Sequence, residues 1–103
     1  ARTAPMASPV HVELTQLLQS WRDGEKDAVA AAFELAYEEL KLIASQRLRQ
    51  ADRPVTLSPT ALLHEAYLRI AVGEVAFMNR EHFYAGMSLY IRSALVDHAR
   101  ARQ

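Results

Sequence analysis

The sequence predicts an all-α fold, a compact domain of four helices packed around one core. Apolar residues recur at intervals of three and four along four segments, and no segment shows the sustained alternation of a half-buried strand. The chain has 103 residues with only three Gly and four Pro, so we expect few turns to interrupt the helices. Half of the residues are apolar, which is enough for the modest core of one small domain.

Two predicted helices occupy the N-terminal half of the chain. The first spans residues 11–21, and its apolar stripe consists of Val10, Leu14, Leu17, Leu18 and Trp21. The pair Asp23-Gly24 ends it, because Gly is a helix breaker. The second spans residues 27–50 as one element, with a stripe of Val29, Phe33, Ala36, Leu40 and Ile43.

The other two predicted helices follow a loop at residues 51–57. The third spans residues 58–72, with Ser58 as N-cap and Pro59 as first helical residue, because Pro has no N–H to leave unpaired there. Gly73 ends it, and the fourth helix spans residues 80–101. From the four stripes we expect these side chains to be largely buried: Leu17, Trp21, Phe33, Leu40, Ile43, Leu63, Tyr67, Phe83, Met87 and Ile91.

Composition limits the classes of function. The chain has no Cys, which excludes disulfides and thiolate metal sites and fits a cytoplasmic location. No apolar run approaches the length of a membrane span, so we expect no membrane association. Residues 1–9 lack the apolar region of a signal peptide and are expected to be a tag or a disordered N-terminus, which leaves residues 10–103 as the domain.

The charge balance is uneven along a chain whose net charge is zero. Residues 10–40 are mainly acidic, residues 41–53 are mainly basic, and the C-terminus is basic again. Such a distribution can give the domain one acidic and one basic face, although a charge run is more often only solvated surface.

Enzymatic function is not expected. His64-Glu65 begins like a zinc-protease helix, but Leu68 stands where the second His is required. The remaining His residues are scattered, and the sequence has neither a nucleophile elbow nor a Gly-rich phosphate loop. We therefore predict no catalytic residues, no metal and no cofactor.

The third helix has a second face that mixes apolar and charged groups, as protein contact surfaces do. This face consists of Ala61, His64, Glu65, Leu68 and Arg69. An ordinary solvent-exposed face would have the same composition.

The segment before and within the fourth helix is rich in groups that suit nucleic acid. Aromatic rings, an amide and cations are concentrated in residues 77–84, where rings can stack on unpaired bases and cations can hold the backbone. Further along, the residues that can face outward are Ser88, Arg92, Ser93, Asp97, Arg100 and Arg102. Arg at such positions suits contacts with phosphates or base edges. Burial of Phe77 and Phe83 in the core is the simpler alternative for those two rings.

Two motifs together resemble region 2 of the extracytoplasmic-function (ECF) sigma factors. They are residues 59–70 (PTALLHEAYLRI) and residues 83–100 (FYAGMSLYIRSALVDHAR). The similarity is greatest to the ECF-like subgroup with an SPTALLHEAYLR-type stretch and a VDHAR ending. It covers the chain from about Leu14 to Arg102 and implies a four-helix domain of the sigma factor region 2 type.

The resemblance also implies a function. Such a domain binds the clamp helices of core RNA polymerase, recognises the minus-ten promoter element and helps to melt it by holding the non-template strand. An anti-sigma factor is a further candidate partner. The implied polymerase-binding residues are Ala61, Leu62, His64, Glu65, Leu68 and Arg69. The implied DNA-binding residues are Phe77, Asn79, Arg80, His82, Tyr84, Ser88, Arg92, Ser93, Arg100 and Arg102.

The sequence departs from the common ECF pattern at four positions. Ala61 stands where an acid is usual, His64 where Gln is usual, Gly86 where Trp is common and Ser93 where Asn is common. The second domain of the family, which recognises the minus-thirty-five element, has no counterpart, so we expect an isolated domain or fragment. The competing hypothesis is a helical interaction module of the anti-sigma or adaptor type that does not bind DNA.

Overall fold

The computed structural model describes residues 9–52, 55–73 and 75–101. Over these residues the protein is all-helical, as predicted, and no strand is formed. The elements are α1 (Pro9–Arg22), α2 (Asp27–Leu35), α3 (Tyr37–Arg49), α4 (Pro59–Val72) and α5 (Arg80–Ala101). Residues 1–8 of the expected N-terminal tag, and the candidate DNA-binding residue Arg102, lie outside the described residues.

The second predicted helix is divided into α2 and α3 at Ala36. This residue has φ −94° and ψ 6°, outside the helical range, so the chain turns there. Backbone hydrogen bonds continue across the turn, since Ala36 N–H donates to Ala32 O and Leu40 N–H donates to Ala36 O. The apolar stripe also continues across it, and no Pro or Gly marks the site. Periodicity therefore predicted one helix where the structure has two.

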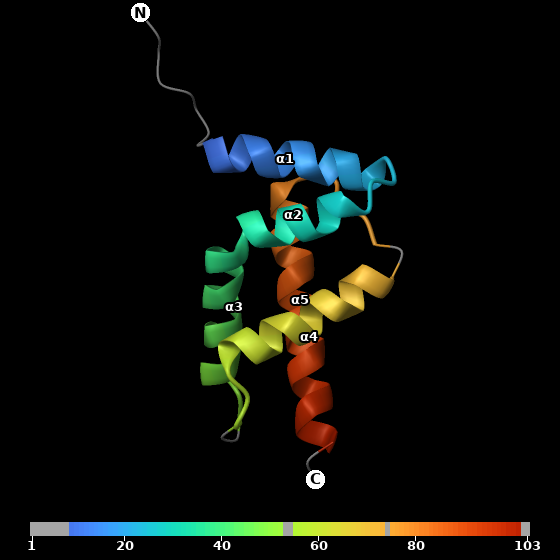
Figure 1. Cartoon of the computed structure of the whole chain (residues 1–103). Coiled ribbons are helices and arrows are strands. Elements are labelled where there is room, and N and C mark those ends of the chain that lie inside the picture. Colours follow the sequence, from blue (N-terminus) through green and yellow to red (C-terminus); the bar gives the residue numbers. More distant parts are fainter. Residues whose placement is uncertain (1–8, 53–54, 74, 102–103) are drawn as a thin grey trace, which may run out of the picture.

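The helices are arranged so that α5 contacts most of the others (Figure 1). The helix α1 lies across the N-terminal end of α5 and packs mainly on α2. The helices α3 and α4 pack on each other and on the body of α5, and α4 crosses α5. The C-terminal end of α5 extends away from α1.

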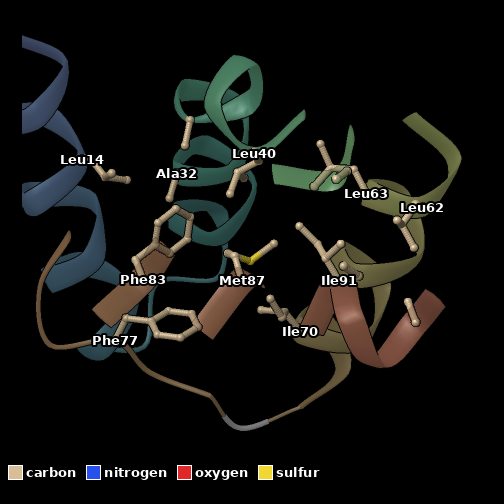
Figure 2. Close-up of a cluster of buried hydrophobic side chains, with 14 of the residues drawn as sticks. Leu14, Ala32, Leu40, Leu62, Leu63, Ile70, Phe77, Phe83, Met87 and Ile91 are labelled. Atoms are coloured by element: carbon tan, nitrogen blue, oxygen red, sulfur yellow. The ribbon is translucent and has the colours of Figure 1, made fainter. Parts of the chain in front are cut away.

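The core is centred on α5 (Figure 2). Five of the residues that the stripes predicted are fully buried, namely Leu40, Leu63, Phe83, Met87 and Ile91. The other five are only half-buried, namely Leu17, Trp21, Phe33, Ile43 and Tyr67. Small residues occupy several of the deepest positions instead, including Ala32, Ala36, Ala44 and Ala66, and they allow the helices to approach closely.

Local sequence signals account for two helix boundaries. Gly24 has a φ of 94°, a left-handed conformation that side chains rarely adopt, and it follows the end of α1. Ser58 is the N-cap of α4, as predicted, because its Oγ accepts a hydrogen bond from Ala61 N–H at 3.1 Å. Pro59 occupies the first position of α4.

Candidate polymerase and nucleic-acid interfaces

The outward face of α4 is smaller than the sequence predicted. Leu62 is fully buried, so its side chain belongs to the core and not to the candidate polymerase-binding face. Burial follows from spacing, because Leu62, Leu63, Ala66 and Ile70 form the stripe of α4 that packs inward. The exposed side chains on the predicted face are His64, Glu65 and Leu68, while Ala61 is half-buried.

Arg69, the last member of that face, points toward α5. Its Nη1 donates a hydrogen bond to Ser93 Oγ at 3.0 Å and lies 2.8 Å from Asp97 Oδ2. The guanidinium thus connects a candidate polymerase-binding helix to two consecutive turns of the candidate DNA-binding helix. Ser93 is itself a candidate DNA-binding residue, and its hydroxyl is already engaged.

Phe77 belongs to the core, although it precedes α5 in a loop. Its side chain is 2% exposed, and its ring packs edge-on against Trp21 and Phe83 at centroid distances of 5.4 Å. Figure 2 shows Phe77 and Phe83 side by side. The ring of Phe77 is therefore not accessible for stacking on a base, and the simpler of the two interpretations from sequence is correct for Phe77 and for Phe83.

Asn79 and His82 together cap α5. Asn79 Oδ1 accepts a hydrogen bond from His82 N–H at 2.8 Å, which makes Asn79 the N-cap. In return His82 Nδ1 accepts a hydrogen bond from Met78 N–H at 3.0 Å. Both side chains remain exposed, but these bonds fix their orientations. The cap could have been recognised from sequence, because Asn directly precedes the predicted helix.

Two further candidates, Arg80 and Tyr84, also have partners. Arg80 Nη2 lies 3.1 Å from Glu81 Oε2 on the surface. The Tyr84 hydroxyl donates a hydrogen bond to Glu39 Oε1 of α3 at 3.2 Å. Burial, reinforced by the adjacent Glu39 carboxylate, raises the pKa of Tyr84 to about 12.

Ser88 connects α5 to the basic end of α3. Its Oγ accepts hydrogen bonds from Arg47 Nη2 at 2.8 Å and from Arg47 Nε at 3.3 Å. A polar recess between the two helices is lined by Ile43, Gln46, Arg47, Gln50 and Ser88. The serine hydroxyl is therefore committed to the α3–α5 contact.

The remaining candidates on α5, Arg92 and Arg100, are exposed. No hydrogen bond or ion pair to another side chain occupies either guanidinium within the described residues. Both candidate DNA-binding cations are therefore open to solvent on the surface of α5.

Sequence reasoning did not identify several residues that hold these surfaces together. Arg22, Glu39 and Arg47 each bond a residue of α5 or of the loop before it, across 41 to 56 positions of sequence. A charged residue on a helix surface gives no local signal that its partner is so distant. Only the folded chain brings these pairs together.

The described residues offer neither a metal site nor a membrane-spanning helix. They contain no group of three or more His, Asp or Glu side chains that could hold a metal ion. None of their helices has the length and apolar character needed to cross a membrane.

The fold is that of a small all-helical domain. Residues 11–103 match the family described as ECF sigma factor, and the chain belongs to that family. The family consists of non-enzymatic transcription factors, and its members act as sigma factors in transcription initiation. Membership implies RNA polymerase and promoter DNA as partners. Comparisons with curated proteins and with solved structures gave no match.

Proposed function

We propose that this domain binds the clamp helices of core RNA polymerase through α4, and recognises and helps to melt the minus-ten promoter element through the loop before α5 and α5 itself. The observation that supports it best is the position of the exposed groups. His64, Glu65 and Leu68 lie on one helix, and Arg92 and Arg100 lie on another that crosses it. Two partners can therefore occupy different helices at once.

The polymerase-binding surface is the exposed part of α4. Leu68 is 47% exposed and lies next to the charged or polar side chains of His64 and Glu65. An exposed apolar group with a polar rim is the usual composition of a protein contact. Leu62 and Arg69 are not part of this surface, since one is buried and the other is bonded to α5.

The DNA-binding surface begins at the loop before α5 and continues along that helix. The chain as a whole has no net charge, so it has little general attraction for duplex DNA. Specific capture of unpaired bases offers a different source of affinity, because bases that have left the stack expose apolar faces. Polymerase would offset the cost of melting by holding the rest of the promoter.

The test is run-off transcription with core polymerase and the purified chain, together with binding of single-stranded and duplex minus-ten DNA to the complex. We expect stable binding to core polymerase and a preference for the single strand. Binding to polymerase without any binding to DNA would favour the alternative, an interaction module of the anti-sigma or adaptor type. Failure to bind core polymerase would contradict the proposal entirely.

A further inference from the structure

The end of α1 is bonded directly to the loop that precedes α5. Arg22 Nη1 donates hydrogen bonds to two consecutive backbone carbonyls, at 2.7 Å to Phe77 O and at 3.2 Å to Met78 O. Carbonyls outside regular structure usually bond to water, whereas here a charged donor holds both of them. The path of the loop at residues 77 and 78 is therefore set from α1.

A second contact fixes the same loop from inside. The ring of Phe77 packs on Trp21 and lies directly against the backbone of Gly86. A Cβ atom at residue 86 would be 2.3 Å from Cε1 of Phe77, so no larger residue leaves room for the ring in this position. The glycine at position 86 therefore allows the Phe77 ring to point into the core.

A third contact fixes the loop where it joins the helix. Met78 N–H donates to His82 Nδ1, and Asn79 caps α5 through its side chain. With both polar backbone groups of Met78 bonded and Phe77 turned inward, the Met78 side chain is left on the outside. It is 66% exposed.

We propose that Met78 is the side chain with which this loop contacts an unpaired base, and that Arg22 is the positioning residue that presents it. The inference rests on the proposed function, since it assigns a residue within the same DNA-binding loop. A thioether side chain is flexible and polarisable and packs well on aromatic faces, and Met is among the apolar side chains that insert at base steps. Arg80 follows two residues later in the chain, and its guanidinium can contact the phosphate backbone of the same DNA strand.

The probe is a single-stranded oligonucleotide with a randomised hexamer, selected by the complex of the wild-type chain with core polymerase. We expect Met78→Ala to weaken binding of the selected strand about fivefold, because roughly half of a large apolar contact is lost. Affinity for core polymerase should not change. Leu42→Ala is the matched control, since Leu42 is 67% exposed on α3, and it should bind the strand as the wild type does.

Arg22 is tested by three variants. Arg22→Ala should weaken strand binding to a similar extent, Arg22→Lys should restore most of it because Lys can still donate to a carbonyl, and Lys26→Ala should remove an equal charge without effect. The double variant Arg22→Ala/Met78→Ala should lose no more than Met78→Ala alone, because both changes act on one contact. A merely structural role of Arg22 would give additive losses.

The outcomes separate this inference from the proposed function. If wild-type chain and polymerase select no strand, the proposed function fails. If a strand is selected and Arg100→Ala weakens its binding, but Met78→Ala binds it as the wild type does, the proposed function stands and the inference is overturned. Additive losses in the double variant would overturn the role of Arg22 alone.

Discussion

Arg69 of α4 and Asp97 of α5 form an ion pair with an Nη1 to Oδ2 distance of 2.8 Å, and the same Nη1 bonds Ser93 Oγ. The two side chains are 33% and 51% exposed, so solvent screens the pair and it adds little to stability. The ion pair has a larger effect on the charge of the α5 surface. Arg69 neutralises the acid that lies between the exposed cations Arg92 and Arg100 on α5.

The first prediction follows from this pair. Arg69→Ala should weaken binding of minus-ten DNA to the complex, because Asp97 is then an unpaired negative charge near the phosphates. The double variant Arg69→Ala/Asp97→Asn should recover most of the affinity, while Asp97→Asn alone should change it little. Strand binding measured at low salt checks all three variants. A double variant as weak as Arg69→Ala would contradict the neutralising role.

The second prediction concerns the polymerase surface. Glu65→Lys should weaken binding to core polymerase, because the reversed charge lies at the centre of the exposed part of α4. The free energy of unfolding should change by less than about 0.5 kcal/mol, as is usual for exposed positions. Core binding and thermal unfolding of the same variant are the two measurements. Glu34→Lys, at an exposed acid on α2, is the control for total charge.

The third prediction tests the position of Leu62. Because its side chain is fully buried, Leu62→Ala should reduce the free energy of unfolding by about 2–5 kcal/mol. Leu68→Ala, on the same helix but half-exposed, should cost much less and should weaken polymerase binding instead. Chemical denaturation of the two variants makes the comparison. Equal losses of stability would mean that the two leucines are not on different faces.

The fourth prediction concerns alkaline pH. The pKa of Tyr84 is raised from 10.0 to about 12, so between these values the unfolded chain releases a proton that the folded chain retains. The unfolded state then binds fewer protons, and stability must fall as pH rises from 10 to 12. Tyr84→Phe should reduce this fall relative to the wild type. Chemical denaturation of the wild type and of Tyr84→Phe at pH 8, 10 and 11 measures the fall in stability. If stability falls equally with pH in both proteins, the raised pKa of Tyr84 is not its cause.

Much of the fold could be predicted from the sequence because its signals are local. The Ser58-Pro59 cap, the turn at Gly24 and the stripe of α5 all depend on neighbouring residues. The turn at Ala36 could not be predicted, because the apolar spacing passes through it unchanged. The burial of Phe77 had no periodic signal either, since the residue precedes the helix, and its burial depends on contacts with α1 and on Gly86.

The sequence predicted the candidate site as segments of the chain, but it did not show how the individual side chains of these segments are oriented. The match over residues 11–103 confirms the family of the chain, while the assignment of α4 and α5 as the binding helices stays a prediction. Which way each side chain points depends on partners that are distant in sequence. Arg69 bonds to Asp97, Ser88 to Arg47 and Tyr84 to Glu39, and each bond removes a polar group from those that α5 or α4 could offer a ligand.

The fifth prediction concerns the exposed cations at the end of α5. Arg100 is exposed, and among residues 9–52, 55–73 and 75–101 no other side chain bonds it, so its guanidinium is available to contact a phosphate of the DNA. Arg100→Ala should then lower strand affinity almost evenly across sequences and reduce the dependence of log K on log salt concentration by about one unit. Titrations of the polymerase complex at several salt concentrations, with the selected strand and with a scrambled one, measure both effects. Arg49→Ala, which removes an exposed cation from α3, is the charge-matched control. A salt slope that is the same for Arg100→Ala and wild type would show that this guanidinium does not contact the DNA.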